Sequence, residues 1–138
     1  MIKDEGLKAI AVEMFSMTEE DMAKVTPEME KAILNATEAV DKYRLVAEVV
    51  SSKYCYAGLK VGQKYVLDRA VEINAQESTA PLCLGAIQPL YEKSTSLLDR
   101  MYQKADITAF MAGFRCTDPG LELGGMGTVE FKISIEEK

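Results

Sequence analysis

The sequence predicts an α+β protein: an N-terminal helical arm, then a small, largely antiparallel sheet with one long inserted helix. Apolar residues recur at helical spacing through the first 42 residues, whereas β-branched and alternating segments dominate from Tyr43 onward. A single further helical pattern, over residues 81–105, interrupts the strands. Helices that precede a run of strands are typical of α+β folds. We therefore expect an acidic helical arm over residues 1–42 and an α+β body over residues 43–138, forming one folded unit.

Three helices are expected in the arm. The first covers residues 3–17, where Leu7, Ile10 and Met14 fall on one apolar face. Thr18 and Thr26 each precede acidic residues, which is typical of a helix N-cap. They begin a short helix that ends near residue 25 and a third helix that runs to about residue 41.

Strands are expected in the body where β-branched residues cluster or apolar and polar residues alternate. They cover residues 44–50, 64–67, 71–73, 109–116 and 128–135. The last of them has the clearest alternation. Before it, the segment Thr117-Asp118-Pro119-Gly120 is a strong turn signal, and the glycines that follow indicate flexible or closely packed backbone.

The inserted helix, residues 81–105, is the element around which the candidate site is built. It is read as one helix, or as two helical pieces bent near Pro89. Cys83 falls in its first turn, where unpaired N–H groups and the positive end of the helix dipole can stabilise a thiolate.

The composition excludes several functions. The 138 residues include no histidine, which removes Ser-His-Asp and Cys-His catalysis and the common histidine-containing zinc sites. The net charge is −6 and no basic run exceeds two residues, so we expect neither nucleic acid nor an anionic membrane surface as partner.

Localisation is predicted from the N-terminus and the cysteines. The first six residues include two acids with no long apolar segment behind them, which argues against a signal peptide. No apolar run approaches the roughly 18 residues that span a bilayer. Three cysteines are an odd number, so they do not form a complete disulfide framework in one chain, and a cytoplasmic location is expected.

Charge divides the chain at Lys42. The arm carries ten acids and five bases, net −5, and the body twelve acids and eleven bases, net −1. One interpretation is simply a solvated helix surface. The other is assembly of a homo-oligomer through apolar stripes on the arm. Those stripes contain Leu7, Ile10, Met14, Met29, Ile33 and Val40.

Short motifs in the body carry a resemblance to a known group. They are Cys55, Gly58, Val61-Gly62-Gln63-Lys64-Tyr65-Val66, Pro81, Cys83, Ala86, Pro89-Leu90, Cys116-Thr117-Asp118-Pro119 and Val129-Glu130-Phe131-Lys132. Residues 43–138 thereby resemble a small, functionally uncharacterised, cysteine-containing family of anaerobic bacteria and archaea. The resemblance implies that the three cysteines occupy fixed places in the fold, and it implies no activity. The acidic arm is a departure from the short form of that family.

The chemistry of the cysteines leaves alternatives open. Cys83 is either a nucleophile or ligand at a helix N-terminus, or a small buried thiol. Asp118, two residues after Cys116, is either a catalytic partner of Cys83 or a residue that caps its own turn. Together Cys55, Cys83 and Cys116 could bind a soft metal ion such as zinc, with Asp118 or water as fourth ligand, although no Cys-x-x-Cys pair is present.

Three functions are consistent with these features. The first is a small cytosolic subunit or small-molecule binding module that oligomerises through its arm. The second is a small cysteine- or metal-dependent enzyme with a pocket formed by Cys83, Cys116 and Asp118. The third is a structural protein whose thiols only pack, and the lack of histidine favours the first and third over the second.

Overall fold

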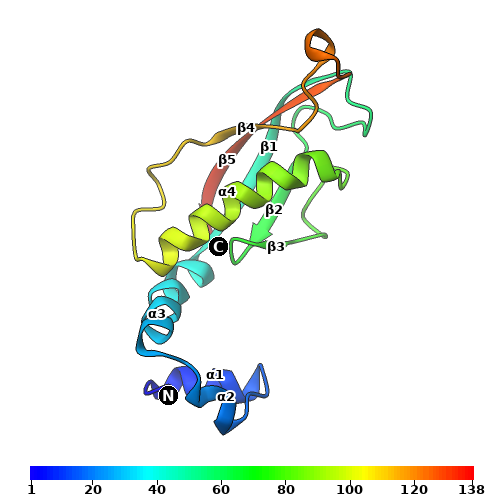
Figure 1. Ribbon diagram of the computed structural model, residues 1–138. Coiled ribbons are helices and arrows are strands. Elements are labelled where there is room, and N and C mark those ends of the chain that lie inside the picture. Colours follow the sequence, from blue (N-terminus) through cyan, green and yellow to red (C-terminus); the bar gives the residue numbers. More distant parts are fainter.

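The computed structural model describes all 138 residues and contains four α-helices and five strands (Figure 1). The elements are α1 (Glu5–Glu13), α2 (Glu19–Ala23), α3 (Pro27–Lys42), β1 (Tyr43–Lys53), β2 (Lys64–Asp68), β3 (Glu72–Ile73), α4 (Leu84–Tyr102), β4 (Gly113–Arg115), the 3-10 helix η1 (Leu121–Leu123) and β5 (Thr128–Glu137). All strand pairs are antiparallel, in the order β3-β2-β1-β5-β4. The predicted α+β fold, with a helical arm first and one long inserted helix, is confirmed.

The helices of the arm begin at side-chain caps. Asp4, Thr18 and Thr26 each accept a hydrogen bond from the backbone N–H three residues later, which satisfies a donor that the first turn leaves free. The first helix is shorter than the predicted range 3–17. It begins only after its cap, and the chain turns away at Ser16, whose φ is 52°.

A small core holds the start of the chain together. It consists of Ile2, Leu7, Ala11 and Val25. The buried carboxylate of Glu30 on α3 accepts the backbone N–H groups of Lys3 and Asp4, at 2.9 and 2.7 Å. Helices α1 and α2 therefore form a separate cluster at the far end of α3, away from the sheet (Figure 1).

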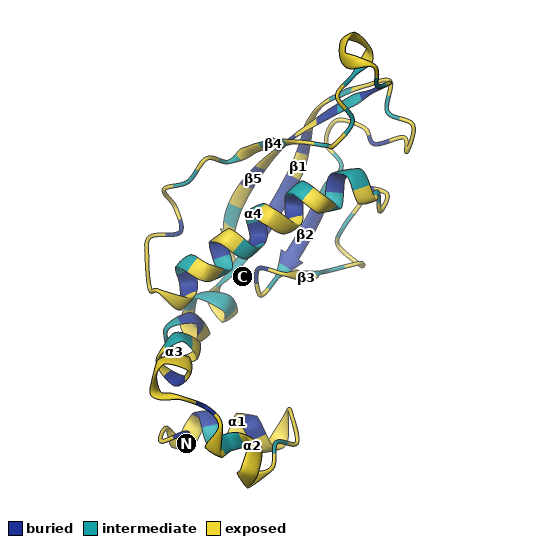
Figure 2. Ribbon diagram, in the orientation of Figure 1, coloured by how far each residue is buried: buried dark blue, intermediate teal, exposed yellow.

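The main core lies between α4 and one face of the sheet. Figure 2 shows the buried stripe of α4 turned toward the buried strands β1, β2 and β5. The residues of this core that α4 contributes are Ala86, Leu90, Leu97 and Met101, and those of the three strands are Leu45, Ala47, Val49, Tyr65, Leu67, Val129, Phe131 and Ile133. The second half of α3 also joins it through Ala36. Helix α3 thus ends at the predicted boundary between arm and body, at Lys42, and its second half packs on the body.

Two strand predictions needed correction. Residues 51–53 were expected to end the first strand, but β1 continues through Lys53 because, after a bulge at Val49 and Ser51, these residues pair with β5. The strand expected over residues 109–116 shrinks to β4, Gly113–Arg115. The carbonyls of Ala109 and Met111 are instead bound by the side chains of Arg100 and Lys93 on α4. None of the helices has the length and apolar character needed to cross a bilayer.

Candidate functional site

The three cysteines, far apart in sequence, line one pocket of about 230 Å³. Cys55 follows β1, Cys83 precedes α4 and Cys116 follows β4, and all three are half-buried, unpaired thiols. The other lining residues are Tyr56, Ala57, Leu59, Gly85, Ala86, Thr117, Asp118, Gly127 and Val129. Of these lining residues, only Asp118 has a side chain that is charged at neutral pH. The structure therefore brings together the residues that the sequence singled out.

Cys83 is the N-cap residue of α4, one position before the first turn in which it was predicted. Its backbone is extended, and its carbonyl accepts the N–H groups of Ala86 and Ile87 at 3.0 and 2.9 Å. Its thiol makes no capping hydrogen bond. The sulfur thus lies, without a capping hydrogen bond, at the positive end of the dipole of a 19-residue helix.

Pro89 lies inside α4 without interrupting it and leaves a carbonyl free to bind the segment that carries Cys116. Proline has no N–H, so the carbonyl of Gly85, four residues earlier, has no helical partner at this position. That carbonyl instead accepts the backbone N–H of Thr117 at 2.9 Å. A Cβ atom at Gly85 would lie only 2.9 Å from Thr117 Oγ1, so the close approach requires glycine. Of the two alternatives, the structure has the single continuous helix, and the carbonyl that Pro89 leaves free binds the segment that carries Cys116.

Tyr65 supports the pocket from the core. Its fully buried hydroxyl donates a hydrogen bond to the carbonyl of Pro81, two residues before Cys83. Burial raises the pKa of Tyr65, the nearby backbone of Cys83 opposes the rise, and the thiols of Cys83 and Cys55 add to it. The hydroxyl therefore stays protonated and holds the segment that leads into α4.

The thiol of Cys116 takes part in backbone hydrogen bonding. Its sulfur accepts the N–H of Val129 at 3.3 Å and lies 4.0 Å from the carbonyl oxygen of Asp118. Cys116 therefore helps join the end of β4 to the start of β5. Among the three cysteines it has the clearest structural role.

Asp118 organises the loop between β4 and β5. Its Oδ1 accepts the N–H groups of Gly120 and Met126 at 3.0 Å, and its Oδ2 accepts that of Gly127 at 3.1 Å. These bonds, the one from Gly120 first, hold the pKa of its carboxyl below the usual range. They match the turn-capping alternative, and they occupy most of the acceptor sites that a catalytic role would use.

The glycines after Asp118 allow the loop between β4 and β5 to pack closely on Asp118 and on the residues at the end of β1. A Cβ atom at Gly127 would stand 2.2 Å from the carbonyl oxygen of Tyr54, and one at Gly125 would stand 2.1 Å from Asp118 Oδ1. Only glycine permits both approaches. The loop therefore packs directly on the end of β1 and forms one wall of the pocket.

The geometry adds no support for a metal site. Nowhere in the chain do three cysteine or carboxylate side chains converge closely enough to hold a metal ion. The three thiols share a pocket without forming such a cluster, and the predicted zinc site at Cys55, Cys83 and Cys116 stays a prediction.

Three residues that contribute to the site carry weak sequence signals. Tyr65 looked like an ordinary strand residue, and Gly85 and Thr117 lay in separate predicted elements. The missing N–H of Pro89, which frees a carbonyl in the helix, is the one signal that could have suggested the contact.

Comparison of the chain with protein-family models, with curated proteins and with solved structures found no match. The resemblance to small cysteine-containing proteins of anaerobes therefore stays a prediction, and the site is interpreted from its own chemistry.

Proposed function

We propose that the protein is a small cytosolic binding module whose thiol-lined pocket takes a small, largely apolar molecule. The convergence of Cys55, Cys83 and Cys116 on one pocket carries the proposal. Its volume of about 230 Å³ is below the roughly 300–1,000 Å³ of common ligand sites but above the ~150 Å³ that accommodates benzene. A single aromatic ring or a small bicyclic compound fits this range.

The polar groups of the pocket favour binding over catalysis. General-base chemistry needs a group free to accept a proton, and the chain has no histidine. The carboxylate of Asp118 already accepts three backbone N–H groups. The hydroxyl of Thr117 and the thiols of Cys55 and Cys83 remain to make one or two orienting contacts with a ligand.

An NMR titration with benzene, phenol and indole tests the proposal. Binding should shift backbone amide signals in the segments 55–59, 83–86 and 116–118 and leave those of α1 unchanged. Ala57→Trp, at an exposed residue that lines the pocket, should weaken binding, whereas Ala109→Trp, at an exposed alanine elsewhere, should not. Shifts scattered over the surface, or equal effects of both variants, would contradict the proposal.

A cysteine-dependent reaction at Cys83 is the second candidate. The thiol at the N-terminus of α4, which makes no capping hydrogen bond and lies beside the first turn of the helix, supports it. Cys83 should then alkylate faster than Cys55 or Cys116 near neutral pH, and Cys83→Ser should abolish the fast phase. Metal analysis of protein purified without chelators tests the metal-dependent form of this candidate. Alkylation of Cys83 only in denaturant would exclude the reactive-site interpretation.

We further propose that the arm assembles the protein into a homo-oligomer. Apolar side chains remain exposed on both of its longer helices, including Ile10 at 39%, Met14 at 59% and Met29 at 49%. The core beneath α1 contains only four buried residues, so burial of this surface would stabilise the arm. Light scattering of the full chain should report a multimer, which Met14→Glu should dissociate. An unchanged mass in the variant, or a monomeric wild type, would overturn this part.

A further inference from the structure

Two of the three cysteines carry sulfur atoms that bond to nothing else in the protein. All three line the thiol pocket, but the sulfur of Cys116 accepts the backbone N–H of Val129 at 3.3 Å. The only hydrogen bonds that any cysteine sulfur makes are those of Cys116. Cys55 and Cys83 therefore place two unengaged thiols in one pocket.

The buried hydroxyl of Tyr65 is a common neighbour of these two thiols. It donates a hydrogen bond to the carbonyl of Pro81, two residues before Cys83. Burial is the main cause of the raised pKa of Tyr65, and the thiols of Cys83 and Cys55 are the only ionisable groups that add to the rise. Interactions of this kind weaken with distance, so both thiols lie near the same buried oxygen atom.

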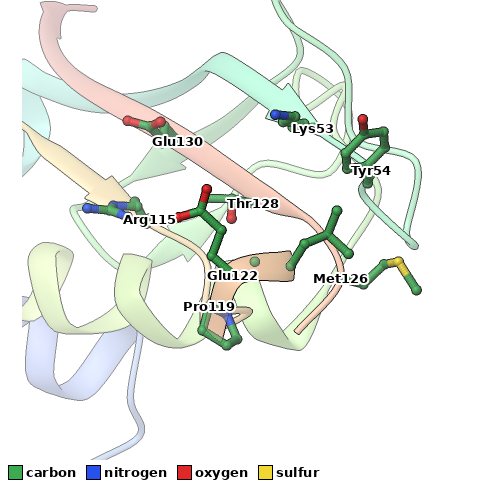
Figure 3. A pocket seen from close by; sticks show the side chains of 10 residues that line it. Lys53, Tyr54, Arg115, Pro119, Glu122, Met126, Thr128 and Glu130 are labelled. Carbon is green, nitrogen blue, oxygen red and sulfur yellow. The ribbon is translucent and has the colours of Figure 1, made fainter. Parts of the chain in front are cut away.

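The turn that carries Cys55 begins at a fixed residue and continues into open space. Figure 3 shows Tyr54, the residue before it, among the residues that line a second hollow of about 370 Å³. The carbonyl of Tyr54 is packed so closely on Gly127 that a Cβ atom there would stand 2.2 Å away. After Cys55, by contrast, the turn closed by Gly58 is exposed, and a Cβ atom at Gly58 would meet nothing within 4 Å. The turn therefore has room to shift.

We propose that Cys55 and Cys83 form a reversible disulfide when the protein meets a hydroperoxide, and that this bond closes the thiol pocket. Both thiols are half-buried, so a small oxidant reaches them. Both residues lie outside the helices and strands, so the approach that a disulfide requires moves no regular element. Closure as a means of regulating binding rests on the function proposed for the pocket, whereas formation of the disulfide does not.

The oxidation takes two steps. The sulfur of Cys83 attacks an oxygen atom of the hydroperoxide: an S–O bond forms, the O–O bond breaks, and the departing oxygen takes the thiol proton. The sulfur of Cys55 then attacks the sulfenic acid at Cys83: the S–S bond forms, the S–O bond breaks, and the hydroxyl leaves with the proton of Cys55 as water. With hydrogen peroxide, two thiols and one peroxide give one disulfide and two water molecules.

Treatment of the reduced full chain with hydrogen peroxide, followed by mass analysis, tests the disulfide. The native protein should lose the mass of two hydrogen atoms, and dithiothreitol should restore it. Trypsin separates the three cysteines, because a lysine or arginine lies between each pair, so non-reducing peptide maps should show Cys55 joined to Cys83. A linkage that includes Cys116, a disulfide between two chains, or gain of oxygen without loss of hydrogen would overturn the proposal.

Single variants assign the roles of the thiols. Cys116→Ser keeps an acceptor for the N–H of Val129 and should form the same disulfide as wild type. Cys55→Ser should stop at a sulfenic acid on Cys83, which dimedone traps, and Cys83→Ser should form no disulfide. A disulfide in Cys83→Ser, or none in a Cys116→Ser protein whose amide spectrum shows the native fold, would contradict the assignment.

Binding is measured separately from the disulfide. The reduced protein should bind indole, the purified disulfide form should bind it at least about tenfold more weakly, and dithiothreitol should restore the affinity. Equal binding by the two forms would overturn closure of the pocket. If the reduced protein binds no indole, the proposed function fails, and the peptide maps still decide whether the disulfide forms.

Discussion

The substitution Tyr65→Phe tests how the core supports the thiol pocket. It removes one hydroxyl from a fully buried side chain and leaves the ring stacked 5.9 Å from that of Phe131. The carbonyl of Pro81 then loses its donor. A hydrogen bond of this kind contributes about 1 kcal/mol net, so we expect a loss of about 1 kcal/mol in the free energy of unfolding.

Urea unfolding measures this loss. For a chain of this size the midpoint should fall by about 0.5–1 M with an unchanged slope. The side chain of Tyr91 on α4 is 65% exposed, so Tyr91→Phe is the matched control and should change the free energy by less than about 0.5 kcal/mol. Native alkylation of Cys83 should become faster in Tyr65→Phe alone, because the segment that leads into α4 is less well held. Equal stabilities of the two variants, with unchanged alkylation, would refute the proposed support.

Three further predictions concern the loop and the arm. Asp118→Asn should destabilise the protein at neutral pH, and the difference in stability from wild type should shrink as the pH falls below about 4, because the lowered pKa of Asp118 gives stability that is lost on protonation. Thermal melts at several pH values measure this difference, and a difference that stays constant with pH would contradict the prediction. Gly127→Ala should lower the free energy of unfolding by about 1–3 kcal/mol or more, because the new Cβ would stand 2.2 Å from a backbone oxygen, whereas Gly113→Ala, whose Cβ would have its nearest atom at 3.9 Å, should be nearly neutral. Equal urea midpoints for the two variants would argue against the close approach at Gly127. Phe15→Glu, at a side chain that is 66% exposed, should lower the oligomer mass in light scattering and leave the thermal stability of the monomer unchanged. A fall in thermal stability together with the mass would point to a role of Phe15 in folding.

Much of the fold follows from local patterns. The caps at Thr18 and Thr26, the long inserted helix and the alternation in β5 are all set by residues close in sequence, so they could be predicted. The strand ends could not. Residues 51–53 are strand because β5 pairs with them. The segment before β4 is not strand at Ala109 and Met111, whose carbonyls are bound by side chains of α4. Tertiary contacts decide such segments more than their own propensity does.

The candidate site, like the fold, depends partly on local sequence patterns and partly on tertiary contacts. The special position of Cys83 could be predicted from the start of a helix. Its meeting with Cys55 and Cys116 depends on strand order and on the hydrogen bond from Thr117 to Gly85, which no local pattern contains.

Intact-mass analysis after treatment with N-ethylmaleimide tests most directly whether the three thiols share one pocket. A first adduct inside a pocket of about 230 Å³ should exclude a second, so the native protein should stop at a single adduct, while the protein in urea should take up one on each of its three cysteines. Peptide mapping should place the native adduct on Cys83. Independent addition to two or three cysteines of the native protein would contradict a shared pocket, as would the absence of any native adduct.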